Sequence, residues 1–199
     1  DFELIVVDDG SDSPLVYDGP LGFPFQLIYT NDKRPWTNDL ARNLASRRAR
    51  GEYLLMTDID HILTSKAIEN VASFKGDMLM FARRVAELNE HGRICNIGRQ
   101  LAPHVNTFAV RKSVFEEIGG YGSHYLGYGS DRVIRQKYKT LLARGLVKPV
   151  QLGATIYVIT ESKWFHKLNR TNYARSHDQR LSPTSHPNGG RAQEACWPD

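Results

Sequence analysis

Two carboxylates separated by one residue stand in the segment Thr57-Asp58-Ile59-Asp60-His61, directly after the apolar run of residues 53–57. If the chain bends at the end of that run, both carboxylates can approach one hard cation. Mg²⁺ or Mn²⁺ held by carboxylates commonly bridges a protein to the phosphates of its substrate. Such an ion also neutralises negative charge on a departing diphosphate. The alternative interpretation of this motif is an exposed acidic turn.

A second acidic cluster, Asp8-Asp9-Gly10-Ser11-Asp12, ends the aliphatic run of residues 2–7. A buried strand that stops at a polar, turn-forming cluster is typical of a parallel α/β sheet, in which ligands bind at the carboxyl ends of the strands. We therefore expect both acidic clusters to face one crevice. Asp8 is expected to steady the turn and not to contact a ligand.

Apolar periodicity predicts the elements that position these clusters. The alternation of strands and helices indicates an α/β/α sandwich with a mainly parallel sheet. Residues 1–175 are expected to form one domain, and residues 176–199 a polar, flexible tail. The expected strands cover residues 2–7, 25–30, 53–57, 77–83, 108–110 and 150–159, and the expected helices cover residues 37–50, 65–74, 112–118 and 130–144.

The composition is that of a soluble globular protein, with 199 residues, 41% of them hydrophobic and 24% charged. No apolar run approaches the roughly 20 residues that cross a bilayer, and no charged-then-apolar leader is present. The chain starts at Asp1 beside an apolar run, which fits a trimmed or partial product. Its two cysteines are too few for a disulfide framework. We expect a reducing compartment and a cytoplasmic location.

The net charge of +4 is unevenly distributed, because six Lys/Arg and one acid lie between residues 163 and 191. A basic segment of this kind can meet nucleic acid, anionic lipid or a phosphorylated ligand. We expect no nucleic-acid partner and a peripheral membrane contact through this segment. A solvated tail is the alternative.

Four blocks stand in order along the chain: residues 2–11, residues 40–43 with 49–53 and 58–60, residues 108–111 with 115–121, and residues 127–131. In order and spacing these blocks resemble family 2 glycosyltransferases, over roughly residues 2–140. The resemblance implies a glycosyltransferase-A type, Rossmann-like fold with a nucleoside-diphosphate sugar in the crevice. The family normally opens with a further strand and helix, and from the start at Asp1 we expect both to be missing here. We expect an oligomer to cover the resulting edge unless neighbouring strands pair directly.

The resemblance also implies roles for individual residues. The donor would be bound by Asp9, Ser11, Arg42 and Asp58, with Asp9 on the uracil or other base. Asp60 would bind the metal. Asp131 would be the catalytic base, although the family's usual Glu-Asp pair stands here as Ser130-Asp131 with Arg132 next. The acceptor would meet the aromatic faces of Tyr121 and Tyr128, with core packing as the alternative for at least one tyrosine.

A second metal ligand is expected at His166, because related metal-dependent galactosyltransferases place a histidine in a comparable late segment. An imidazole ligand favours Mn²⁺ over Mg²⁺, and a surface or core histidine is the alternative. His61, beside the acidic motif, is expected to point away from it. His104 has no partner that the sequence identifies.

These features together predict a metal-dependent hexosyltransferase. It would move a sugar from a UDP-sugar to a hydroxyl of a carbohydrate or other acceptor, with inversion and with Mn²⁺ or Mg²⁺ as cofactor. A nucleotidyltransferase is the alternative enzyme, although the chain lacks a Gly/Lys/Arg-rich phosphate loop near its first strand. A catalytically degenerate nucleotide-sugar binding module is the alternative that is not an enzyme.

Overall fold

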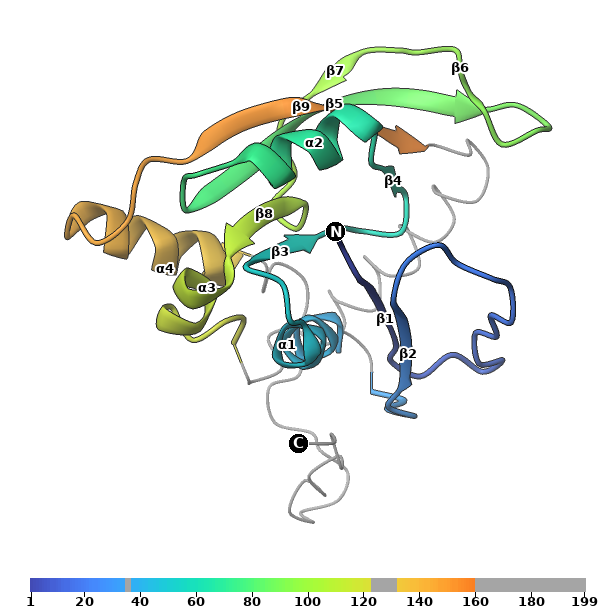
Figure 1. Ribbon diagram of the computed structural model, residues 1–199, viewed down its shortest axis with the longest axis horizontal. Coiled ribbons are helices and arrows are strands. Elements are labelled where there is room, and N and C mark those ends of the chain that lie inside the picture. The colour runs from blue at the N-terminus through green and yellow to red at the C-terminus, as the bar shows by residue number, and fades with distance from the viewer. Residues whose placement is uncertain (35–36, 123–131, 160–199) are drawn as a thin grey trace, which may run out of the picture. The chain divides into compact units, whose positions relative to one another are not determined.

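The computed structural model describes residues 1–34, 37–122 and 132–159 (Figure 1). These residues form two compact units, which are described separately below. Unit 1 contains Asp1–Gly51 with Tyr121, and unit 2 contains Glu52–Gly120 with residues 132–159. The expectation of a single domain over residues 1–175 stays a prediction.

Unit 1 is built on two parallel strands, β1 (Leu4–Asp8) and β2 (Phe25–Tyr29), and one helix, α1 (Asn38–Arg48). The strands begin and end within two residues of the bounds that the aliphatic runs predict. Helix α1 packs against β1, with Ala41 and Leu44 buried one turn apart on the same face. The unit therefore places the Asp8-Asp9 cluster at the carboxyl end of β1, as the sequence predicts.

Helix α1 begins directly after Thr37. The Thr37 side chain makes no capping hydrogen bond to the helix, although its carbonyl oxygen accepts from the Ala41 N–H at 2.9 Å. Its hydroxyl instead donates to Asp9 Oδ2 at 2.7 Å. The side chain of Thr37 therefore binds the acidic cluster, and only its backbone carbonyl group takes part in the helix.

Unit 2 contains a seven-stranded sheet with the order β3-β8-β5-β9-β4, and two short strands, β6 and β7, also pair with β5. Figure 1 shows the two longest strands, β5 and β9, side by side, and their pairing is parallel. The strands are β3 (Tyr53–Met56), β4 (His61–Ile62), β5 (Met78–Leu88), β6 (Ile94–Cys95), β7 (Gln100–Leu101), β8 (Phe108–Arg111) and β9 (Gln151–Ile159).

This sheet is mixed and not strictly parallel, because β8 runs antiparallel to both of its neighbours and β4 runs antiparallel to β9. The cause lies in the connections. A parallel pair needs a crossover, usually a helix, whereas an antiparallel pair does not. No helix lies between β5 and β8, so β8 returns in the opposite direction. Helices do separate β3 from β5 and β5 from β9, and these three strands run the same way.

Helices supply the rest of the core of unit 2. Helix α2 (Ser65–Ser73) packs against β9, and its first turn is capped by Thr64, whose side chain accepts from the Ala67 N–H at 3.1 Å. Helix α3 (Lys112–Glu117) follows β8 directly, and α4 (Arg132–Ala143) precedes β9. The central buried cluster consists of Ala67, Phe74, Leu79, Phe81, Ala109 and Ile156.

Three strands are absent from the sequence prediction: β4, β6 and β7, each two residues long. Two residues are too few for an alternating pattern. Strand β5 also continues beyond its predicted end, to Leu88. None of the helices in the described parts of the chain has the length and apolar content that a bilayer-spanning segment requires.

Candidate functional site

The Asp58–Asp60 motif forms a short turn between β3 and β4 in unit 2. The His61 N–H donates to the Asp58 carbonyl oxygen at 3.2 Å, and the Asp60 carbonyl oxygen accepts from the Ile159 N–H at 2.8 Å. The first bond closes the turn, and the second anchors it to the end of β9. The Ile59 side chain is fully exposed, whereas both aspartate side chains are partly buried. The turn therefore holds its two carboxylates in place and turns the residue between them to solvent.

His61 lies against these carboxylates, so the expectation that it points away from the motif is wrong. Its side chain is almost fully buried, and its Nδ1 lies 3.2 Å from Asp60 Oδ1. The same nitrogen lies 3.3 Å from Thr107 Oγ1 and 4.0 Å from Asp58 Oδ2. The cause is the pairing of β4 with β9, which fixes the face on which His61 stands. A buried imidazole needs polar partners, and the acidic turn supplies them.

His104 is a second residue of this cluster that the sequence analysis missed. Its Nδ1 lies 2.9 Å from Asp58 Oδ2, and its ring centroid lies 5.3 Å from that of His61. The residue stands in the loop before β8, far from the acidic motif in sequence. No local spacing pattern could connect His104 to the acidic motif. The position of strand β8, and not the sequence of the loop itself, brings His104 to the turn.

Arg83, on β5, places a cation against His61. Its Nε donates to the Ala102 carbonyl oxygen at 2.7 Å, and its NH1 lies 3.1 Å from His61 Nε2. Burial lowers the pKa of the Arg83 guanidinium, and the carboxylates of Asp60 and Asp58 act in the opposite direction. A guanidinium stays protonated in proteins, so this group contributes a positive charge beside the acidic turn.

The donor set of the turn fits a divalent metal. One ligand atom each from Asp58, Asp60 and His61 lies within 4.8 Å of the others. Two carboxylates are the ligands that Mg²⁺ and Mn²⁺ prefer, and an imidazole among them would favour Mn²⁺. The two aspartates are the ones that the sequence singles out. His166, the other predicted ligand, lies outside the described residues.

In unit 1, Asp9 stands where the sequence expects a donor-binding carboxylate. It is partly buried, and Thr37 bonds one of its oxygens. The adjacent turn is tied to a second loop, because Lys33 Nζ donates to the carbonyl oxygens of Gly10 and Ser11 at 3.0 and 2.9 Å. A fixed turn presents the Asp9 carboxylate and the Ser11 hydroxyl in constant positions. Gly10 has a φ of +125°, and a Cβ there would lie 2.0 Å from the Asp32 carbonyl oxygen.

Arg42 and Tyr121 pack together in the same unit. The Arg42 guanidinium carbon lies 5.6 Å from the centroid of the Tyr121 ring, and Arg42 NH1 lies 3.7 Å from Asp39 Oδ1. The Asn43 side chain binds both the N–H and the carbonyl oxygen of Tyr121. Tyr121 is only 1% exposed, which fits the core-packing alternative for this tyrosine. Its acceptor role stays a prediction. Tyr128 and Asp131 lie outside the described residues.

Asp8 holds the turn that precedes Asp9. Its carboxylate accepts from the backbone N–H groups of Ser11, Leu15 and Gly10 at 2.9, 2.8 and 3.2 Å. These bonds, that of Ser11 foremost, lower the pKa of Asp8 to about 2. The geometry agrees with the expectation that Asp8 steadies the turn.

The bonds to Asp8 predict a specific pH dependence of stability. Because its pKa is lowered on folding, the carboxylate stabilises the fold fully above about pH 4, and this contribution disappears as the pH falls toward about 2. We expect Asp8→Asn to lower the free energy of unfolding near neutral pH by about 1–3 kcal/mol and to flatten its decline in acid. Urea unfolding at several pH values measures both effects. Asp12→Asn, at an exposed aspartate of the same turn, is the control, and equal behaviour of the two variants would contradict this role.

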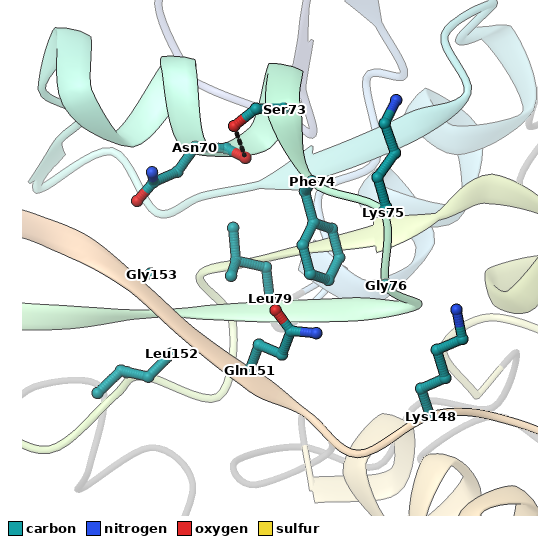
Figure 2. A pocket seen from close by; sticks show the side chains of 10 residues that line it. All are labelled: Asn70, Ser73, Phe74, Lys75, Gly76, Leu79, Lys148, Gln151, Leu152 and Gly153. Carbon is teal, nitrogen blue, oxygen red and sulfur yellow. Dashed lines mark hydrogen bonds between the residues drawn. The ribbon is translucent and has the colours of Figure 1, made fainter.

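A groove of about 450 Å³ lies elsewhere in unit 2, between the carboxyl end of α2 and the first residues of β5 and β9 (Figure 2). Its side chains include Lys75, Lys148 and Gln151. Leu79 lines the groove, whereas Arg83 of the acidic cluster stands four residues further along β5, roughly 13 Å away. The Asn70 Oδ1 in its wall already accepts from the Ala154 N–H at 2.8 Å. The groove is thus separate from the acidic cluster, and we assign it no reaction.

Comparison with known protein families gives a match over the first part of the chain. The model of the family described as "Glycosyl transferase family 2" matches residues 1–128. The matched range includes β1, the Asp8-Asp9 turn, the Asp58–Asp60 turn and His104. No curated protein matches the chain.

Proposed function

We propose that this chain, which belongs to glycosyl transferase family 2, is a metal-dependent hexosyltransferase. Membership of the family makes it a glycosyltransferase with a nucleotide-sugar donor and the glycosyltransferase-A fold. In our proposal the donor is a UDP-sugar, and the reaction inverts the anomeric carbon. The observation that carries the metal dependence is the pair of partly buried carboxylates, Asp58 and Asp60, held in one turn at the end of β3.

In this proposal the two aspartates of the turn hold the divalent ion, with Asp60 as the principal ligand. When bound, the ion supplies the positive charge that offsets the negative charge of the departing diphosphate. Arg83 and the two histidines around the turn keep the carboxylates oriented before the donor arrives. Such pre-organisation is where most of the rate enhancement of an electrostatic site originates.

The donor's base is assigned to the Asp8-Asp9 turn of unit 1. The Thr37 hydroxyl donates to Asp9 Oδ2, which fixes the carboxylate. In this proposal the other oxygen, Oδ1, accepts from an N–H group of the uracil. Arg42 is proposed to reach the sugar or the phosphates. These roles rest on the family resemblance, and the described contacts of both residues are compatible with them.

The transfer step itself is assigned to Asp131. A hydroxyl oxygen of the acceptor forms a bond to the anomeric carbon as the bond from that carbon to the diphosphate oxygen breaks. The diphosphate leaves with the electron pair, and the hydroxyl proton passes to Asp131. An in-line displacement of this kind inverts the anomeric configuration. Holding the donor and acceptor in line and neutralising the charge of the diphosphate together contribute most of the rate.

A panel of nucleotide sugars tests the donor class. With Mn²⁺ present, UDP-sugars are expected to raise the melting temperature more than GDP- or dTDP-sugars at equal concentration. A ligand at 100 times its Kd stabilises the protein it binds by about 2.7 kcal/mol, which a thermal scan resolves easily. Stabilisation by another nucleotide alone would contradict the UDP assignment. Binding without any turnover in the presence of acceptors would identify the degenerate module instead.

A further inference from the structure

The two ring nitrogens of His61 have partners of opposite kinds. On one side, Arg83 NH1 lies 3.1 Å from Nε2. A guanidinium has only N–H donors to offer, so Nε2 must accept this hydrogen bond with its lone pair. A proton on Nε2 would instead face the N–H of a cation. The contact with Arg83 therefore places the imidazole proton on Nδ1.

On its other side the ring then donates. The Nδ1–H faces Asp60 Oδ1 at 3.2 Å and Thr107 Oγ1 at 3.3 Å, whereas Asp58 Oδ2 is more distant at 4.0 Å. A hydrogen bond to a carboxylate is stronger than one to a hydroxyl, so Asp60 is the main acceptor. Thr107 is 1% exposed and closes this side of the ring to water. The chain of bonds runs from Arg83 through His61 to Asp60.

We propose that His61 is a positioning residue for Asp60 and not a metal ligand, despite its place within the cluster of three metal-binding residue types. A metal on Nδ1 would displace the proton that Asp60 accepts. With Nε2 still accepting from Arg83, the ring would then carry no proton and would be an anion. His61 instead fixes Asp60 Oδ1 and leaves Oδ2 as the oxygen that meets the ion. His104, 2.9 Å from Asp58 Oδ2, restrains the other carboxylate.

The inference rests on the proposed metal site, but its first test needs no metal. In protein with isotope-labelled histidine nitrogens, NMR is expected to show His61 as the neutral ring with Nδ1 protonated, its signals assigned by their loss in His61→Asn. Adding NMR-active Cd²⁺, a probe that favours nitrogen ligands, is expected to produce no cadmium–nitrogen coupling at His61. An unprotonated Nδ1, or such a coupling, would overturn the proposal.

Variants test the positioning role through metal affinity. In His61→Asn the amide N–H₂ takes the place of Nδ1–H and still donates to Asp60, whereas His61→Ala offers no donor. Loss of a residue that orients a ligand costs about 10–100-fold in metal affinity. Calorimetry with Mn²⁺ and UDP is therefore expected to show that loss in His61→Ala and a change of less than about threefold in His61→Asn. Equal losses in the two variants would indicate a ligand and overturn the proposal.

Arg83 and its neighbour provide a matched pair. Arg83→Met removes the donor that fixes the tautomer, whereas Arg84→Met removes the same charge from a side chain that donates to the Gly98 carbonyl oxygen. Only Arg83→Met is expected to weaken Mn²⁺ binding, by about tenfold. If the two variants weakened Mn²⁺ binding equally, Arg83 would act only through its charge, and the proposed chain of hydrogen bonds from Arg83 through His61 to Asp60 would be overturned. If the wild type did not bind Mn²⁺, the proposed function would be contradicted. The tautomer of His61 in the metal-free protein would then be the one test of the hydrogen-bond assignment.

Discussion

Asp60→Asn is expected to reduce sugar transfer by about 10²–10⁴-fold while leaving the fold intact. The charge that a bound metal supplies in the transition state is worth several kcal/mol, and each 1.36 kcal/mol corresponds to a factor of ten in rate. Asparagine keeps an oxygen at the Oδ1 position, which lies 3.2 Å from His61 Nδ1. The variant therefore removes the negative charge and preserves the hydrogen bond that positions the side chain.

The measurement is the initial rate of transfer at saturating donor over a series of Mn²⁺ concentrations. Glu69→Gln is the matched control, because it removes one carboxylate charge from the exposed face of α2 in the same unit. Its rate is expected to equal that of the wild type. An Asp60→Asn enzyme within about threefold of the wild type at every Mn²⁺ concentration would contradict the assignment of Asp60 as the principal ligand.

Asp131→Asn is expected to lower transfer by about 10²–10⁴-fold, the usual contribution of a general base. The amide has nearly the size of the carboxylate but cannot take the proton of the acceptor hydroxyl. Asp131 directly precedes α4 in the sequence and lies outside the described residues. The assignment therefore rests on the family resemblance, in which Ser130-Asp131 stands where a Glu-Asp pair is usual.

The loss should be confined to the chemical step. Mn²⁺-dependent UDP binding by Asp131→Asn is expected to match that of the wild type, since the base contacts the acceptor and not the diphosphate. Transfer by the wild type should also give a product of inverted anomeric configuration, which NMR of the product determines. Full activity of the variant, or a product with the donor's own configuration, would show that Asp131 is not an inverting base.

The strands and helices with strong apolar periodicity could be predicted from the sequence, and the way that they pair could not. The runs that became β1, β3 and α1 end at turn-forming or charged residues, which mark their bounds locally. The direction of β8 depends on its pairing with β3 and β5, which are distant in the sequence. Strand direction is a property of such pairs, so no local pattern marks β8 as an antiparallel member of the sheet.

The residues of the candidate site likewise fall into two groups, those that a local sequence pattern marks and those that only the tertiary structure brings together. Asp9, Asp58 and Asp60 could be identified because they follow apolar runs and stand at family-like spacing. The orientation of His61 depends on the pairing of β4 with β9, and the bond between His104 and Asp58 joins a loop to a remote turn. Contacts of this kind follow from the tertiary arrangement alone. A histidine beside an acidic motif is therefore better assigned from its hydrogen-bond partners than from its position in the sequence.

The central claim is that a divalent metal joins the acidic turn to the donor's diphosphate. Calorimetric titration of the wild-type protein with UDP, once with Mn²⁺ and once with EDTA, tests it most directly. Without the ion, the diphosphate meets the carboxylates of Asp58 and Asp60 as a like charge. We expect UDP to bind about 100-fold more tightly with Mn²⁺, a difference of about 2.7 kcal/mol in binding free energy. Equal affinity in Mn²⁺ and in EDTA would contradict the account.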